Sequence, residues 1–327
     1  MRCAFLSGAE FKRNIIVKLP RDCSALLGCQ GVTYMKMNKS AYGLSDAPLL
    51  WWREADRRLR STGLKRHRLD KCCYMFYNKD GALCAMLILH VDDLLLGANM
   101  NDPEAESLIQ RLRACFDFGK WQSLDADKQL VYCGGHITKI EDNLSLDCET
   151  YLKKVLPITV AKGRGKDQPL APQETSKARG LIGALQWPAG QACLQLNAST
   201  SIIAANINKG TVDLLHELNK TLRFAKNSAD LRLTMRPVCG DWSEMCLLCF
   251  SDAAVQVRAG SSSQGGFVIS LINTKVLEGK SAPYSIVAWR SYKLPKVCRS
   301  SLSAEAQSCA TALDELMMVK TSPDATT

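Results

Sequence analysis

The 327-residue sequence contains only four histidines, and they lie far apart in the chain. One CxxC pair is present, Cys246 and Cys249, but no second ligand pair follows it at the spacing of a zinc site. Structural zinc needs four converging ligands, so the sequence argues against a zinc centre. No repeat of fixed period is visible either, which argues against a solenoid or propeller.

The sequence also lacks a long apolar run free of charge. Its longest apolar run, residues 82–98, carries His90, Asp92 and Asp93 near the middle. Two carboxylates at the centre of a bilayer would be very costly, so this run does not predict a membrane span. The N-terminus shows no apolar stretch followed by a small-residue cleavage site. We therefore expect an intracellular protein, in the cytoplasm or nucleus, with neither signal peptide nor membrane segment.

Composition places the chain among globular proteins. Apolar residues make up 46% and charged residues 23%, which excludes collagen, extended disorder and coiled coil. The 15 cysteines are scattered, and many lie in apolar stretches, as Cys84 and Cys309 do. Buried free cysteine behaves as a small hydrophobe, so this usage indicates reduced thiols.

The formal net charge of +10 is unevenly distributed. Residues 53–71 hold eight basic and three acidic residues, and residues 289–299 hold four basic residues beside Trp289 and Tyr292. Basic stretches with nearby aromatics suit a phosphate backbone and stacked bases. Taken alone, each stretch is better explained as a solvated helix face or a basic loop, and its position beside the motifs below gives it weight.

Three blocks follow one another along the chain. Residues 1–160 mix short strands and helices, residues 162–177 form a Gly/Pro/Lys-rich linker or exposed loop, and residues 178–232 are mainly helical. Strands are predicted at residues 245–251, 266–272 and 286–289, and a helix at 300–319. The predicted apolar stripe of that last helix consists of Leu302, Ala306, Cys309, Leu313 and Leu316.

Residues 84–97 (CAMLILHVDDLLLG) place two apolar runs around Asp92 and Asp93. The simplest interpretation is a tight β-hairpin with both aspartates in the turn, where Asp is common. Adjacent carboxylates on an apolar base repel each other unless cations neutralise them. Because Mg²⁺ takes oxygen ligands and also binds substrate phosphates, the hairpin tip is a candidate magnesium platform.

HVDD at residues 90–93 is similar to the YVDD motif of reverse transcriptases from copia-type LTR retrotransposons. The resemblance implies a fragment of a Pol polyprotein, with RNA-directed DNA polymerase and ribonuclease H activities. It implies an α+β chain: a reverse-transcriptase palm (antiparallel sheet with helices on one face), a helical connection and a partial ribonuclease H-like domain. These would occupy residues 1–160, 161–240 and 241–327. Further matching segments lie, in the family's order, at residues 4–20, 39–52, 132–137, 151–156, 180–185 and 216–226.

The resemblance assigns roles residue by residue. Asp92 and Asp93 would hold two Mg²⁺ ions, Phe5 would exclude a ribose 2′-hydroxyl, and Tyr42 and Gly43 would lie along the incoming dNTP and template. Without the family context, Phe5 is a core residue and Gly43 a turn glycine. The implied partners are an RNA template, a DNA primer and an RNA–DNA hybrid. The helix after Pro48 would bury Trp51, Ala55 and Leu59 and direct its arginines toward nucleic acid: Arg53, Arg57, Arg58 and Arg60.

A second carboxylate pair lies in the last block. Asp252 ends a predicted strand and Glu305 lies in the following helix, a spacing similar to the ribonuclease H domain of the same family. Both would be metal ligands for hydrolysis of the RNA strand of a hybrid. Each also has a structural interpretation, Asp252 as a turn residue and Glu305 as a first-turn acid favoured by the helix dipole. The basic loop between them would contact the hybrid through Arg290, Lys293 and Lys296.

Some features depart from the family pattern. The family's first metal-binding aspartate would fall just before Met1, and a further ribonuclease H aspartate has no match after residue 305. His90 stands where the family has tyrosine. We therefore expect little activity from this chain alone. Two alternatives stay open, a non-catalytic nucleic-acid-binding remnant and a decayed reading frame whose product does not fold stably.

Overall fold

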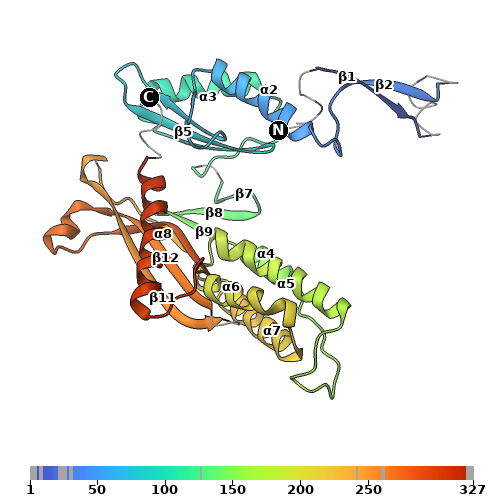
Figure 1. The fold of residues 1–327 in the computed structure, drawn as a ribbon. Coiled ribbons are helices and arrows are strands. Elements are labelled where there is room, and N and C mark those ends of the chain that lie inside the picture. Colours follow the sequence, from blue (N-terminus) through green and yellow to red (C-terminus); the bar gives the residue numbers. More distant parts are fainter. Residues whose placement is uncertain are drawn as a thin grey trace. The chain divides into compact units, whose positions relative to one another are not determined.

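The computed structural model describes residues 6, 10–20, 28, 32–125, 127–240, 242–258 and 262–321. The chain forms two compact units, Met1–Trp121 with Ser322–Thr327, and Gln122–Thr321. Each unit combines helices with β-sheets, and all strand pairs in the described ranges are antiparallel (Figure 1). Mixed α/β structure with antiparallel sheets confirms the predicted class at this level.

The first unit contains two sheets. The ribbon of β1 (Glu10–Lys18) and β2 (Tyr34–Lys39) is separate from a four-stranded sheet of order β3-β4-β5-β6. The strands of the larger sheet are β3 (Lys65–Arg66), β4 (Cys73–Tyr77), β5 (Leu83–His90) and β6 (Asp93–Ala98). Helices α2 (Ala47–Ser61) and α3 (Pro103–Cys115) pack on one face of it (Figure 1).

The sequence pattern explains this packing. Trp51, Ala55 and Leu59 recur one turn apart on α2 and are all buried, which confirms the predicted buried face. Along β5, Leu87 and Leu89 face these residues, and burial of each large apolar side chain contributes about 1.5–3 kcal/mol. The opposite face of β5 is open.

The second unit begins with a sheet of order β10-β9-β8-β7. Its strands are β7 (Gln129–Tyr132), β8 (Gly135–Ile140), β9 (Asn143–Asp147) and β10 (Leu233–Met235). The helices are α4 (Glu149–Lys154), α5 (Pro172–Gln191), α6 (Asn197–Asn206) and α7 (Val212–Asn227), with short 3₁₀ turns η2 (Leu194–Leu196) and η3 (Ile207–Lys209). They enclose one apolar core, to which α7 contributes Leu214, Leu218 and Leu222, one turn apart in the region predicted to be helical.

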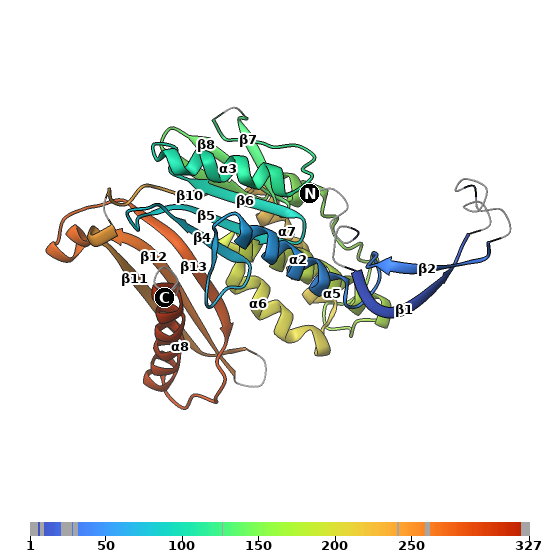
Figure 2. The same cartoon turned by 90° about the horizontal axis from the view of Figure 1, so that it is seen from above.

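The unit ends in a three-stranded sheet of order β11-β12-β13, with α8 (Ser301–Thr321) along one face (Figure 2). Its strands are β11 (Met245–Arg258), β12 (Ser262–Asn273) and β13 (Tyr284–Lys293), with 3₁₀ turns η4 (Trp242–Glu244) and η6 (Thr274–Glu278). The strands and the helix lie where the sequence predicts them, and each strand is longer than predicted.

The predicted apolar stripe of α8 was wrong except at Leu316, which packs against the sheet. Leu302 is 78% exposed, and Cys309 and Leu313 are also exposed. The face that packs on the sheet carries Ala304, Ser308 and Ala312, which are 0–2% exposed. Close approach of helix and sheet selects small side chains there, and a search for large apolar residues misses them.

The segment at residues 162–177 also differs from the predicted loop, because Pro172 already begins α5. The preceding residues are tied to the start of α7, where Val212 N donates to Gln168 O at 2.9 Å and Asp213 N to Lys166 O at 3.0 Å. None of the helices in the described ranges combines the length and apolar composition that a membrane crossing requires.

Candidate functional site

The tip of the β5–β6 hairpin carries the first carboxylate pair. His90 pairs with Asp93, so Val91 and Asp92 form a two-residue turn and Asp93 is the first residue of β6. The sequence predicted the hairpin but placed both aspartates in the turn. Asp92 is half-buried and Asp93 is exposed.

Val91 adopts φ +53°, in the left-handed region that β-branched side chains rarely occupy. Such a conformation costs of order 1–3 kcal/mol and persists only where the surroundings fix it. One contact that holds the Val91 backbone in this conformation is a hydrogen bond, in which Trp51 Nε1 on α2 donates to Val91 O at 2.6 Å. The helix beneath the sheet therefore holds the backbone that presents Asp92.

The two faces of the hairpin differ. Side chains alternate along a strand, and cross-strand partners share a face. Asp93 and its partner His90 therefore lie on the face of Met86 and Ile88, which are 37% and 42% exposed. The helices α2 and α3 cover the other face. One carboxylate thus borders a partly exposed, mainly apolar sheet surface.

The residues expected to contact the nucleotide are placed in part. Tyr42 is exposed, and Gly43 has φ +94° in a turn closed by Leu44 N donating to Ala41 O at 3.3 Å. A Cβ added at Gly43 would meet nothing within 4 Å, so the glycine serves the backbone conformation and leaves space above it. Phe5 lies outside the described residues.

The arginines of α2 are engaged to different degrees. Glu54 accepts hydrogen bonds from Arg57 and Arg58, which hold the pKa of its carboxyl at about 2, below the ordinary 4.5. Arg58 also donates to Cys115 O at 3.2 Å and stacks on the Phe116 ring. Arg60 lies 3.7 Å from Asp56. Arg53 is exposed, so the outward charge available to a ligand comes from Arg53 and from the exposed ends of Arg57 and Arg60.

The two members of the second carboxylate pair lie at the edge strand β11, but on opposite faces of it. Glu305 Oε1 on α8 accepts from Ala253 N at 3.3 Å, directly beside Asp252. Ala253 and Val255 pack toward α8, so strand alternation places the exposed Asp252 side chain on the other face of the sheet. Glu305 therefore reaches the strand as predicted, from beside Ala304 and Ser308 rather than from beside a buried Leu302.

Tight packing fixes this approach of α8. Ser308 Oγ donates to Asp252 O at 2.8 Å, and Gly266 N donates to Ser308 Oγ at 3.3 Å. The basic stretch predicted as a loop begins within β13, which includes Arg290 and Lys293. Arg290 lies 3.6 Å from Glu315 and over the Tyr292 ring. Both predicted lysines of that stretch, Lys293 and Lys296, are exposed.

Both carboxylate pairs offer hard oxygen ligands, the kind that Mg²⁺ prefers. Asp92 and Asp93 present theirs at an accessible tip, which fits one side of a magnesium site. Within the described ranges, no group of three or more His, Cys, Asp or Glu side chains is arranged to hold a metal ion. The remaining ligands of such an ion would therefore come from substrate phosphates, water or other parts of the chain.

Comparison with known proteins bears on the hairpin directly. A family model described as reverse transcriptase (RNA-dependent DNA polymerase) matches residues 1–170, more than half of the chain and including the hairpin. The chain belongs to the reverse transcriptase family.

Two relatives from Arabidopsis thaliana extend the similarity. The Retrovirus-related Pol polyproteins from transposons RE2 and RE1 are each 22% identical to this chain, over 295 and 305 residues. The matches cover 87% of this chain and 19% of each relative. This reverse transcriptase chain thus spans about a fifth of the length of the curated relatives it matches.

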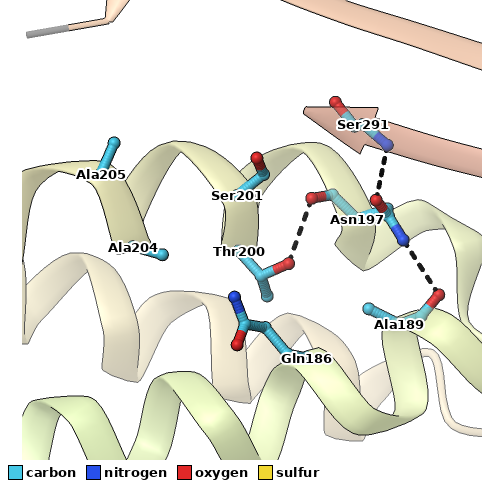
Figure 3. Close-up of a pocket in the computed structure, with 8 residues that line it drawn as sticks. All are labelled: Gln186, Ala189, Asn197, Thr200, Ser201, Ala204, Ala205 and Ser291. Carbon is cyan, nitrogen blue, oxygen red and sulfur yellow. Dashed lines mark hydrogen bonds between the residues drawn. The ribbon is translucent and has the colours of Figure 1, made fainter. Parts of the chain in front are cut away.

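A polar joint in the second unit was not predicted from the sequence. A pocket of about 360 Å³ lies between α5, α6 and β13, and its eight lining side chains are uncharged (Figure 3). Asn197 Oδ1 accepts from Ser291 N at 2.7 Å, and its Nδ2 donates to Ala189 O at 3.2 Å. Gln264 Nε2 donates to Ser291 Oγ at 2.7 Å. These bonds fasten α6 to the sheet and offer no titratable group for catalysis.

Buried Asp56 was also missed. Its carboxylate accepts from Arg66 Nη1 at 3.0 Å and from the Tyr74 hydroxyl at 3.1 Å. Burial, together with the Asp56 charge, raises the pKa of Tyr74. From the sequence, only the excess of positive charge in residues 53–71 was interpreted, so the structural role of Asp56 was missed.

Proposed function

We propose that this chain derives from the polymerase and ribonuclease H segments of a copia-type Pol polyprotein, and that Asp92 and Asp93 take part in RNA-directed DNA synthesis. Residues 1–160 would form the palm-like part, 161–240 the connection and 241–327 the ribonuclease H-like part. The single observation that carries the proposal is the hairpin tip, where Asp92 lies in the turn and Asp93 borders a partly exposed sheet face, in the segment matched by the family model.

The proposed roles of the residues follow from their placement. The Trp51 hydrogen bond holds the Val91–Asp92 turn in position, so the carboxylates meet a ligand in a fixed geometry. The space above Gly43 allows a nucleotide or template strand to approach the backbone closely. A DNA primer, an RNA template and dNTPs are the partners this arrangement would serve.

Divalent ions held by Asp92 and Asp93 would activate a primer 3′-hydroxyl and neutralise the leaving pyrophosphate. The two carboxylates supply only part of such a site in the described chain. We therefore expect weak cation binding and little nucleotide incorporation by this chain alone.

The test is Mn²⁺ binding followed by electron paramagnetic resonance, in the full chain and in the Asp92→Asn/Asp93→Asn variant. We expect the variant to bind Mn²⁺ at least tenfold more weakly at the hairpin. A matched control exists, because Glu141 and Asp142 form another acidic two-residue turn, between β8 and β9, and Glu141 has φ +55°. The Glu141→Gln/Asp142→Asn variant should leave the strongest Mn²⁺ site intact. Equal Mn²⁺ affinity in wild type and the Asp92/Asp93 variant would contradict the proposal.

Primer extension on an RNA template with Mg²⁺ measures the activity itself. We expect little incorporation from the purified 327-residue chain. Robust incorporation that survives the Asp92→Asn/Asp93→Asn change would show that polymerisation does not depend on this hairpin.

For the ribonuclease H-like part, we propose that Asp252 and Glu305 are metal ligands and that Arg290, Lys293 and Lys296 contact an RNA–DNA hybrid. The support is the reach of Glu305 to the Ala253 amide on β11 and the exposure of Asp252 on the same strand; the two carboxylates lie on opposite faces there, so they do not share one ion in this arrangement. Salt-sensitive binding of a labelled hybrid, weakened in a Lys293→Glu/Lys296→Glu variant, would agree with this role. Affinity that barely changes with salt would contradict it.

A further inference from the structure

An apolar groove lies in the second unit, away from both carboxylate pairs in the sequence. It is a cavity of about 330 Å³ between the extended segment at residues 155–159 and helix α5. The segment contributes Leu156 and Pro157, and the helix contributes Gly180, Leu181 and Ala184. Such a volume accommodates one large apolar side chain.

The wall formed by the segment is rigid. Asn219 on α7 grips the backbone of Ile158 twice, because its Oδ1 accepts from Ile158 N at 2.9 Å and its Nδ2 donates to Ile158 O at 2.8 Å. Ile158 is buried in the core of the unit, which leaves Leu156 78% exposed. A large apolar side chain is therefore held outward by a fixed backbone.

The side of the groove formed by α5 carries small side chains. Gly180 and Ala184 lie one turn apart on α5, and a Cβ added at Gly180 would meet nothing within 4 Å. Leu181, between them, is buried and forms the floor. The space over this helix face is open to an incoming side chain and needs no rearrangement of the chain.

The rim is positively charged. Residues 150–166 contain five basic residues and no acidic residue. Three of these charges are matched within the chain, as Lys153 ion-pairs with Glu149, Arg164 with Glu174 and Lys166 with Asp213. Three further lysines are exposed near the groove: Lys154 and Lys162 flank the segment, and Lys177, whose charge also acts on Glu174, lines the groove.

We propose that this groove binds an acidic peptide segment of a partner protein, which seats one large apolar side chain against Leu156, Gly180 and Ala184 and places carboxylates near Lys154 and Lys177. The preformed wall lowers the entropy cost of binding, and the exposed lysines Lys154, Lys162 and Lys177 favour a negatively charged ligand. A peptide fits better than a nucleic acid, because the groove is lined by aliphatic groups and offers no aromatic ring on which a base could stack.

The probe is a fluorescein-labelled synthetic peptide of Asp and Glu residues around a single Trp, measured by fluorescence anisotropy with the full chain. Two control probes carry Ser in place of Trp or Gln in place of the acids. We expect the parent probe to bind, and each control probe to bind at least tenfold more weakly. Equal binding of the parent and Ser probes would show that the apolar groove is not used and would overturn the proposal.

Variants locate the binding site. Leu156→Ser removes the exposed wall, and Lys177→Glu reverses the rim charge; both side chains are exposed, so the fold should tolerate them. We expect each variant to weaken binding of the parent probe at least tenfold. The matched controls are Leu302→Ser on α8, where the leucine is also 78% exposed, and Lys275→Glu in η6, and both should bind as the wild type does.

A labelled single-stranded RNA of similar charge tests the other class of ligand. If that RNA binds more tightly than the peptide and Lys177→Glu weakens it while Leu156→Ser does not, the site is a nucleic-acid surface and the proposal is wrong. Retention of peptide affinity in both Leu156→Ser and Lys177→Glu would refute it equally.

Discussion

Gly265 on β12 is the position where one methyl group should disturb the contact between α8 and the sheet. A Cβ built there would lie 2.6 Å from Leu294 Cδ2 and 3.1 Å from both Ser308 Oγ and the Tyr292 ring. Leu294 and Ser308 are 1% and 0% exposed, so neither can move aside without disturbing packed neighbours. Overpacking of this kind costs about 1–3 kcal/mol. We expect Gly265→Ala to lower the stability of the second unit by this amount.

The adjacent glycine provides the control. A Cβ at Gly266 would lie 3.4 Å from Arg290 O and 3.9 Å from Ser291 Oγ, so Gly266→Ala should change stability by less than about 0.5 kcal/mol. Urea unfolding followed by circular dichroism measures the difference, and hydrogen exchange at the Ala253 amide reports locally on α8, because Glu305 accepts from that amide. Equal stability of the two variants, with unchanged exchange at Ala253, would refute the packing argument.

Three further predictions concern the first unit. Val91→Gly removes the backbone strain of φ +53°, so the thermal midpoint of this variant should not fall below that of the wild type. Val131→Gly on β7, where φ is not positive, should lower the midpoint. A lower midpoint for Val91→Gly would contradict the inference that Val91 is strained. Asp56→Asn removes the charge facing Arg66 and should cost about 1–3 kcal/mol in urea unfolding, while Asp80→Asn at an exposed turn should be neutral; equal effects would show that the buried network is unimportant. The pKa of Glu54 is about 2 in the folded chain and 4.5 ordinarily, so its stabilising contribution is present above pH 4.5 and lost as the pH falls toward 2. The thermal midpoints of wild type and Glu54→Gln should therefore differ at neutral pH and converge at pH 2. A difference that stays constant with pH would argue against the ion pairs.

Sequence periodicity predicted the elements well where large apolar residues face the core. The stripe of Trp51, Ala55 and Leu59 on α2 is buried as expected, and so are the leucines of α7. The same rule failed on α8, where contact with the glycine-containing strand β12 requires Ala304, Ser308 and Ala312. Periodicity measures hydrophobicity, and at close contacts the small size of the side chains decides which face packs.

The sequence predicted the carboxylates of the candidate sites. It did not predict the hydrogen bonds that hold the backbone in place. The HVDD motif identified Asp92 as a candidate, and the end of a predicted strand identified Asp252. The bond from Trp51 to Val91 and the grip of Asn219 on Ile158 join residues 40 and 61 positions apart. Such bonds follow from tertiary packing, and local sequence carries no signal for them.

The contact between Glu305 and the Ala253 amide creates a competition. β11 is the outer strand of its sheet in the described chain, and an outward amide without a partner is a template for pairing with another chain. A cation that draws the Glu305 carboxylate away would leave this amide unprotected. Cation occupancy and strand-to-strand association of two molecules would then be linked equilibria, each strengthening the other by the same factor.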